Sequence, residues 1–295
     1  MSIVAFWNDD KEQTGKTLTS VAVATRMSME RNFKILLIST AYKDPTMGNC
    51  FFEKRTEKVK GLFMGKNNSI AVENGIEGLS KLISSNKIQP NIITDYTRVV
   101  FKDRLEVLSG YIGAKDKTDV ENYRDYKKIS ESYIELIRLA NMYYDMVLVD
   151  VDNRLDPNVR KEIIEISHVN VFVLSQRLVT LQRYIDLKNQ KIDVLGQKCI
   201  PVIGKYNRNS KYNKKNVMRY LGEKKDLNII PYSTLFFEAA EEANVTEMFL
   251  KLRNIKDTND SNYFFMEEVL KLTNNIIDRV QELQKKMRWE DVRDF

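Results

Sequence analysis

Short apolar runs alternate with longer amphipathic stretches along this chain. The apolar runs contain many β-branched residues and end at polar or turn-forming positions, a pattern typical of buried strands. We expect strands at residues 3–7, 34–39, 105–108, 143–150, 169–175, 199–207 and 228–232. The helices that we expect are one ending near residue 32 and others spanning about 75–84, 128–142, 156–167, 179–190 and 262–289. This alternation predicts an α/β fold with a mostly parallel sheet covered by helices on both faces.

The same pattern runs from end to end without a linker rich in proline, glycine or serine and without a repeat. The 295 residues are enough to bury one large core, so we expect a single domain over residues 1–295. No apolar run approaches the roughly 18 residues of a membrane span, and the first strand begins too early to leave room for a signal peptide. The content of 43% hydrophobic and 30% charged residues is that of an ordinary soluble globular protein.

Cysteine and histidine are scarce, which narrows the class of protein further. Cys50 and Cys199 are too few for a disulfide framework, so we expect a cytoplasmic protein. The one histidine, His168, leaves little for a structural zinc site. A Ser-His-Asp triad would depend wholly on His168, which we interpret instead as a packing or surface residue.

Residues 3–25 carry the main chemical signal. The first apolar strand is followed by a polar loop, then by Gly15-Lys16-Thr17, and then by a helical pattern. In this order a GK[ST] sequence predicts a phosphate-binding loop, in which Lys16 reaches the outer phosphates and the Thr17 hydroxyl holds magnesium. The start of the helix itself favours an anion. Asp10 stands where the usual pattern has a glycine five residues before Gly15.

The loop sequence KEQTGKT, residues 11–17, resembles the deviant Walker A motif of the ParA/MinD family of P-loop ATPases, whose usual form is KGGxGK[ST]. Lys11 matches the signature lysine of that motif. Its two glycines are replaced here by Glu12 and Gln13. The resemblance implies a P-loop NTPase fold that binds ATP and Mg²⁺, with catalytic roles for Lys11 and Lys16. The loop residues that it implies for nucleotide binding are Lys11, Thr14, Gly15, Lys16, Thr17 and Leu18.

Later segments resemble the same family in the same order. Asp150 closes an apolar strand as a Walker B aspartate does, which implies that it anchors the magnesium held by Thr17. The segment KDPTMGN resembles the DxDPxGN switch and implies a catalytic role for Asp44. The first aspartate of that switch, which orients the attacking water in the family, falls near Ser39 or Tyr42 here, so we expect slow hydrolysis.

The segments YNR and IPYSTLFFEAAEEANV resemble the family's base-binding elements. They imply that Asn207 reads adenine and that Pro231 and Tyr232 wall the base. In the family ATP closes two subunits face to face. The resemblance therefore implies a nucleotide-dependent homodimer in which Lys11, a long and mobile point charge, crosses to the partner's phosphates.

Positive charge is concentrated between residues 205 and 225, in a chain of net charge +6 and pI near 9.0. Interleaved lysines, arginines and tyrosines can neutralise DNA phosphates without reading bases. A solvated loop and helix face would give the same pattern. The DNA contacts that we expect from the first interpretation are Lys205, Arg208, Lys211, Lys214, Lys215 and Arg219.

Three functional interpretations remain open. One is a DNA-partition ATPase, placed on the bacterial nucleoid, whose hydrolysis a partner protein stimulates. Another is a TadZ/CpaE-like factor that positions pilus or division machinery at a pole, and the third is a nucleotide-binding scaffold without hydrolysis. The altered loop and switch favour the second, whereas the basic segment favours the first. The apolar stripe at 262–289 predicts packing against the sheet rather than a MinD-like membrane anchor, because the final residues are partly acidic.

Overall fold

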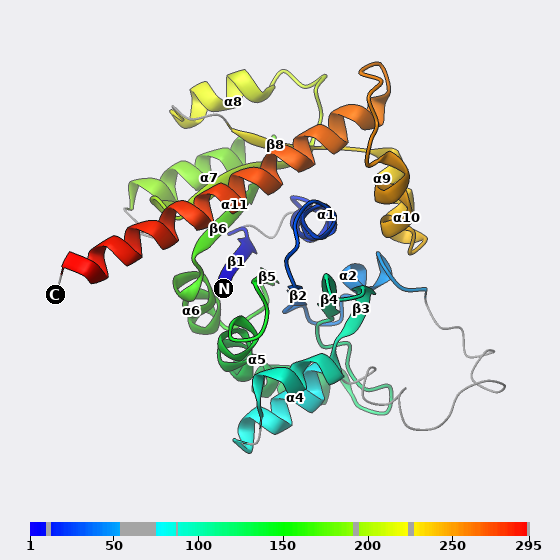
Figure 1. The fold of residues 1–295 in the computed structure, drawn as a ribbon, viewed down its shortest axis with the longest axis vertical. Coiled ribbons are helices and arrows are strands. Elements are labelled where there is room, and N and C mark those ends of the chain that lie inside the picture. The colour runs from blue at the N-terminus through cyan, green and yellow to red at the C-terminus, as the bar shows by residue number, and fades with distance from the viewer. Residues whose placement is uncertain (10–12, 54–74, 87, 191–194, 224–226, 294–295) are drawn as a thin grey trace.

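The computed structural model describes residues 1–9, 13–53, 75–86, 88–190, 195–223 and 227–293. One α/β domain is built around an eight-stranded sheet of order β3-β4-β2-β5-β1-β6-β7-β8 (Figure 1). Of the described strands, β3 alone pairs antiparallel. The strands are β1 (Ser2–Trp7), β2 (Ile35–Ser39), β3 (Arg98–Phe101), β4 (Leu105–Leu108), β5 (Met146–Asp150), β6 (Val169–Leu174), β7 (Cys199–Tyr206) and β8 (Asn228–Pro231).

Helices cover both faces of this sheet, as the alternation in the sequence predicts. The described helices on one face are α4 (Gly75–Ser84), α5 (Asp119–Asn141), α6 (Pro157–Ile166), α7 (Leu178–Asn189) and α8 (Lys214–Leu221). Those on the other face are α1 (Lys16–Glu30), α2 (Thr46–Asn49), α9 (Thr234–Glu241), α10 (Val245–Leu252) and α11 (Ser261–Arg293). A 3₁₀ helix, η2 (Pro90–Tyr96), leads into β3.

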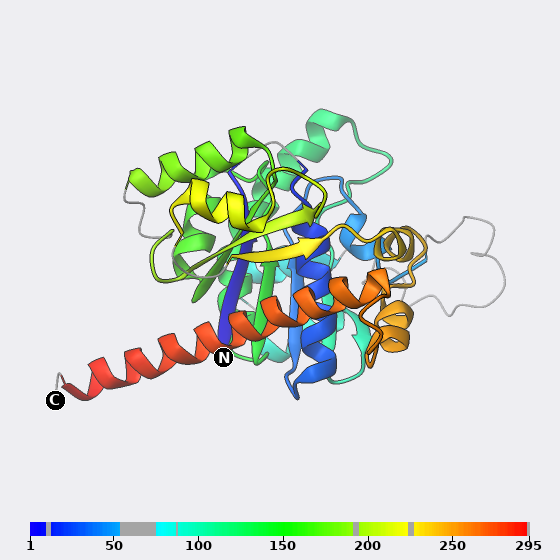
Figure 2. The ribbon, with the colours of Figure 1, turned by 90° about the horizontal axis from the view of Figure 1, so that it is seen from above.

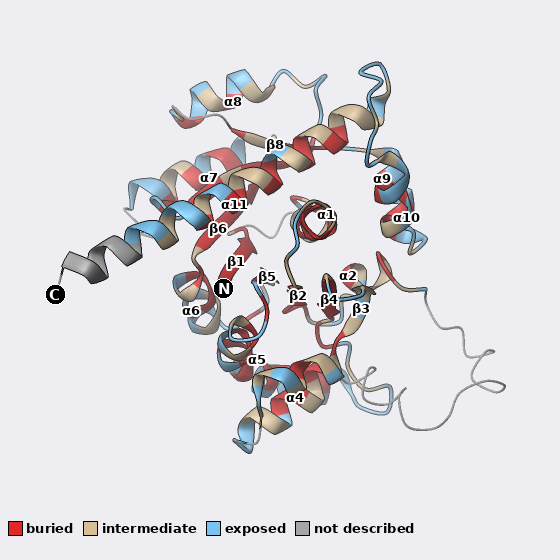
Figure 3. Cartoon of the chain, viewed as in Figure 1, coloured by how far each residue is buried: buried red, intermediate tan, exposed pale blue. Residues whose placement is uncertain are grey.

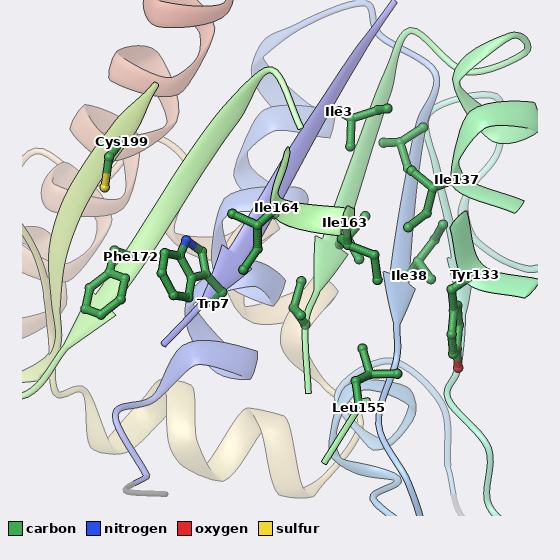
Figure 4. Close-up of a cluster of buried hydrophobic side chains, with 14 of the residues drawn as sticks. Ile3, Trp7, Ile38, Tyr133, Ile137, Leu155, Ile163, Ile164, Phe172 and Cys199 are labelled. Atoms are coloured by element: carbon green, nitrogen blue, oxygen red, sulfur yellow. The ribbon is translucent and has the colours of Figure 1, made fainter. Parts of the chain in front are cut away.

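The core follows from strand alternation, because successive side chains point to opposite faces. In β1, Ile3, Ala5 and Trp7 join the cluster under α4–α8, whereas Val4 and Phe6 join the cluster under α1 and α11. Buried residues accordingly line the sheet and the inner sides of the helices (Figure 3). Trp7 meets Phe172 edge to face at 4.5 Å between ring centroids (Figure 4). This contact anchors the end of β1, from which the predicted phosphate-binding loop departs.

Most of the predicted elements are present, and the differences lie at their ends. The helix predicted from residue 128 begins at Asp119, where Thr118 and Glu121 form a capping box. The strand predicted over 143–150 begins at Met146, because the Tyr144 amide still donates to the Ala140 carbonyl and closes the last turn of α5. β3 has no counterpart in the prediction; it is a short, partly exposed edge strand.

The predicted terminal helix is α11, and it packs as the apolar stripe indicates. Phe265, Val269, Leu272 and Ile276 are buried against α1 and β8. Within the described residues, no helix combines the length and the apolar character needed to cross a membrane. α11 therefore belongs to the fold over most of its length.

Candidate nucleotide-binding site

The loop after β1 ends at Gly15, the N-cap of α1. Gly15 has φ +83°, in the left-handed region that glycine enters without strain. It has no side chain to cap the helix, and the first turn of α1 contains no acidic residue. The amides at the start of α1 therefore remain available to an anion, whose charge the helix dipole also favours.

Asp150 brings the two functional groups of the loop together. Strand pairing places it beside Phe6 at the end of β1, and only 2% of its surface is exposed. Thr17 Oγ1 donates to Asp150 Oδ2 at 2.7 Å. Lys16 Nζ lies 2.8 Å from Asp150 Oδ1 and also donates to the Val151 carbonyl.

These groups fit a magnesium ion. Asp150 Oδ1 has an ion-pair partner in Lys16, but no group in the described part of the chain donates to it with hydrogen-bond alignment. A buried carboxylate oxygen and a hydroxyl at the head of a helix are the hard oxygen donors that Mg²⁺ prefers, with water and phosphate completing its shell. Thr17 and Asp150 are therefore the residues that would hold the ion.

A cleft of about 770 Å³ opens in front of these residues. Thr14, Gly15, Lys16, Thr17 and Leu18 line it, as the loop motif predicts. Asp44 and Asp150 line it as well, so the described catalytic and metal candidates share one cleft. Lys11 was also predicted to act there and lies outside the described residues.

The Asp44 carboxylate accepts hydrogen bonds at the start of α2. Its Oδ1 accepts from the Thr46 amide at 3.0 Å and from Thr46 Oγ1 at 2.6 Å. This carboxylate therefore stabilises the turn that opens α2 while its residue borders the cleft. Ser39 is the last residue of β2, and its hydroxyl accepts from the Ala41 amide at 3.2 Å.

The cleft also contains polar residues that the sequence reading missed. Asn153 Nδ2 donates to Asn8 Oδ1 at 3.0 Å, and Asn8 Nδ2 lies 3.4 Å from Thr14 Oγ1. This chain of amides ties the segment after β5 to the loop that precedes α1. At the entrance to the loop, Arg183 Nη2 lies 2.6 Å from Asp9 Oδ2, so α7 holds the loop as well.

Asp152 and Arg154 form a second missed pair. Burial opposes ionisation of Asp152, but hydrogen bonds from the Arg154 side chain and amide outweigh it and lower the pKa of Asp152. Arg154 Nη2 lies 2.6 Å from Asp152 Oδ2, and both residues line the cleft. Their position directly after Asp150 was the available signal, since parallel strands bring such residues to the carboxyl edge of the sheet.

The predicted base-binding residues lie beside this cleft, around a second cavity of about 720 Å³. Asn207, Pro231 and Tyr232 line it together with the start of α11. The Asn207 backbone amide donates to Gln176 Oε1 at 2.7 Å, and the Asn207 side-chain oxygen Oδ1 accepts from the Asn209 backbone amide at 2.9 Å. Pro231 and Tyr232 also border a smaller pocket with Gly15 and Leu18, which connects the two regions.

Several solved structures have a similar fold. A ParA family ATPase from Chlorobium tepidum has a TM-score of 0.64 and 13% identity, covering 92% of this chain and 98% of its own. MinD from Pyrococcus horikoshii, in complex with Mg-ADP, has a TM-score of 0.59 and 13% identity, covering 92% and 95%. A putative plasmid partition protein from Borrelia burgdorferi, bound to AMPPNP, has a TM-score of 0.54 and 16% identity, covering 97% and 99%. This chain has the ParA/MinD ATPase fold.

The ParA/MinD fold confirms the resemblance inferred from the motifs, together with the single α/β domain and its mostly parallel sheet. The assignment of this fold rests on structural similarity alone, because no protein-family profile and no curated protein matches the sequence. The individual site assignments stay predictions.

The basic segment lies on the outer side of this ParA/MinD fold. Lys215 and Arg219 are exposed on α8, and Lys214 is half-buried at its start. In the preceding loop, the Arg208 guanidinium lies 4.5 Å from the centre of the Phe264 ring, and Lys211 is exposed. Lys205 differs from the other predicted DNA contacts, because its side chain lies over Gly15.

Proposed function

We propose that the protein is an ATP-binding switch that uses Mg²⁺, closes as a homodimer with nucleotide, and serves spatial positioning or DNA partition. The observation that carries this proposal is the convergence of Lys16, Thr17 and Asp150 on one buried point at the head of α1. The ParA/MinD fold supports it, since relatives with that fold were solved with Mg-ADP and with AMPPNP.

Lys16 is held across the site by Asp150 and the Val151 carbonyl. Binding of a phosphate would replace these partners, and the ammonium would then neutralise phosphate charge. Magnesium, when bound, draws negative charge from the phosphate oxygens. Thr17 and Asp150 would hold the ion in place, and Thr14 and Gly15 shape the loop. The chain thus contributes positioning and charge, which is how phosphoryl transfer is catalysed in P-loop proteins.

The homodimer is supported by the apolar residues exposed on the edge of the sheet that carries the loop. Many of the large exposed apolar residues lie in the loops that follow β4, β6 and β8 or near the start of the helices after those loops. They are Ile112, Val120, Tyr123, Leu178, Val179, Tyr232, Leu235 and Phe237. Exposed apolar side chains of this kind are available to a protein interface. In such a dimer Lys11 would reach the nucleotide of the partner.

The choice between partition and positioning depends on the segment around α8. Exposed cations there support attachment to DNA phosphates, which favours partition with a stimulating partner protein. The TadZ/CpaE-like alternative, a positioning factor with weak or no hydrolysis, is supported by the hydrogen bonds that Asp44 Oδ1 accepts from Thr46, which occupy that oxygen at the start of α2. A fluorescent fusion spread over the nucleoid supports the former, and a polar focus supports the latter.

The first prediction tests nucleotide binding itself. Calorimetric titration with Mg-ATP should give binding for the wild type and little or none for Lys16→Ala, because the variant loses the one cation that pairs with Asp150 in the described site. Lys34→Ala, which removes an ammonium from the opposite end of the sheet, is the matched control and should bind normally. Equal affinities of the wild type and Lys16→Ala would refute the proposal.

A second expectation concerns hydrolysis. Phosphate release from the wild type should be slow without a partner protein.

A further inference from the structure

Strand β7 ends directly on the phosphate-binding loop. A Cβ added to Gly204 would lie 2.2 Å from the Thr14 carbonyl oxygen and 3.0 Å from Val173 Cγ1. Only glycine fits at that distance, so the backbones of β7 and the loop are in contact there. The residue that follows Gly204 therefore lies next to the loop.

The residue that follows is Lys205, and its backbone is unusual. Its φ is +50°, in the left-handed region that residues with a side chain rarely adopt. The pairing of β7 with β8 shifts register between Ile203 and Tyr206, so Lys205 lies in an irregular part of the strand. This irregularity turns its side chain out of the normal alternation of the strand.

The Lys205 side chain crosses the loop at Gly15. Its Cγ lies 2.9 Å, and its Cε 3.4 Å, from the point that a Cβ on Gly15 would occupy. The glycine at position 15 therefore leaves room for this lysine as well as for its own left-handed backbone. Lys205 borders the 770 Å³ cleft together with Lys16, and it borders the smaller pocket that Leu18 and Pro231 share.

The charge of Lys205 also favours binding of an anionic ligand at the loop. In the part of the chain that the structure describes, no carboxylate lies within 4.0 Å of the Lys205 ammonium, whereas Lys16 is paired with Asp150. The side chain is exposed, so its charge is available to a ligand. An ammonium beside the uncapped start of α1 adds a full positive charge to a site that already favours anions.

We infer that Lys205 is a second phosphate-binding lysine of this site, which contacts the α- and β-phosphates of the bound nucleotide. Lys16 reaches toward Asp150 at the inner end of the cleft, whereas Lys205 lies between the loop and the wall formed by Pro231. This inference rests on the proposed nucleotide binding. It removes Lys205 from the DNA contacts predicted from the sequence and leaves the remaining cations around α8 as that surface.

The experiment is calorimetric titration of wild type, Lys205→Ala, Lys205→Arg and Lys211→Ala with Mg-ADP and Mg-ATP. Lys205→Ala should bind both nucleotides about ten- to a hundredfold more weakly, the loss typical of one charge-assisted hydrogen bond. Lys205→Arg should retain most of the affinity because it keeps the charge. Lys211→Ala, which removes a neighbouring exposed lysine away from the loop, should bind as the wild type does. Unchanged thermal unfolding of the nucleotide-free variants excludes misfolding as the cause.

Two results would overturn the inference while leaving the proposed function intact. In one, Lys205→Ala binds Mg-ADP as tightly as the wild type while Lys16→Ala does not bind. In the other, Lys205→Ala keeps its nucleotide affinity and loses DNA binding, which would return Lys205 to the DNA surface. Failure of the wild type to bind either nucleotide would overturn the inference and the proposed function together.

Discussion

At the scale of single residues, Asp150 organises the site because it receives both a hydroxyl and an ammonium from the loop. A buried carboxylate is stable only when such partners compensate for its lost hydration. In the proposed function, Lys16 would move to phosphate and Asp150 would then hold the metal ion. Without ligand, the ion pair with Lys16 and the hydrogen bond from Thr17 compensate for the burial of Asp150.

His168 gives a prediction at the same scale. Its Nδ1 accepts from the Ile3 amide at 3.0 Å, which only a neutral ring can do. Burial, with Lys198 and the N-terminal amine, lowers the pKa of His168 below its ordinary value of 6.5. The unfolded chain therefore binds the proton more readily. The stabilisation from His168 is present above about pH 6.5 and is lost as the pH falls below that value.

The expected result is a fall in the unfolding free energy of up to about 1.4 kcal/mol per pH unit below that point. His168→Asn is the comparison, because its amide oxygen can accept the same hydrogen bond and does not titrate. Urea unfolding of both proteins at about pH 8 and pH 5 measures the difference. Since His168 is the one histidine of the chain, identical pH dependence in the two proteins would contradict the assignment.

At the scale of elements, α5 connects a helix cap to the site. Thr118 and Glu121 form the capping box at its start, and Tyr126 in its second turn donates to the Thr40 carbonyl at 2.9 Å. Thr40 Oγ1 in turn donates to the Asp150 carbonyl at 3.1 Å and accepts from the Asp152 amide at 2.8 Å. The position of α5 therefore bears on the strand end that carries the metal candidate.

Replacement of Thr118 by Ala should lower the free energy of unfolding by about 1 kcal/mol, the usual loss for a helix N-cap. Thr118→Ser keeps the capping oxygen and should stay close to the wild type. Urea unfolding at neutral pH distinguishes them. A Thr118→Ala variant as stable as the Ser variant would show that the capping box contributes nothing.

The elements also show how far the sequence could be read. The capping pair at 118–121 is visible in the sequence, so the true start of α5 was predictable from a known motif. Strands β1, β2 and β4–β8 were predictable because burial on both faces makes them largely apolar runs. β3 was not, since an edge strand of four partly exposed residues has neither periodicity nor length. The contact of Lys205 with Gly15 could not be predicted from spacing alone, because it depends on a left-handed backbone and on tertiary packing.

At the scale of the whole molecule, the loop and the basic surface around α8 are predicted to act together. If ATP closes a dimer, two α8 surfaces are joined in one particle, and linked sites can gain roughly 10²–10⁴ in avidity. DNA binding should therefore appear with ATP, fall steeply with added salt and show little sequence preference. Gel shifts at low salt, with and without ATP, test this.

Two triple variants distinguish the contribution of the α8 surface from that of general positive charge. Charge reversal at Lys211, Lys215 and Arg219 should abolish DNA binding while the ATP-dependent dimer persists in light scattering. Reversal of three exposed lysines elsewhere, Lys81, Lys128 and Lys161, changes the net charge equally and should have a much smaller effect. If both triple variants lose DNA binding equally, general charge rather than the α8 surface is responsible. Absence of any nucleotide-dependent complex would favour the positioning-factor alternative.

The shape of α11 has a mechanical consequence. This helix has 33 residues, which corresponds to roughly 50 Å of rigid rod. Ser261 and Phe264 in its first turn border the cavity that Pro231 and Tyr232 line, and its opposite end projects beyond the body of the domain (Figure 2). A tilt of about 5° at the cavity would displace the far end by about 4 Å. Because α11 is one continuous helix, a shift of its start beside this cavity would be carried to its far end.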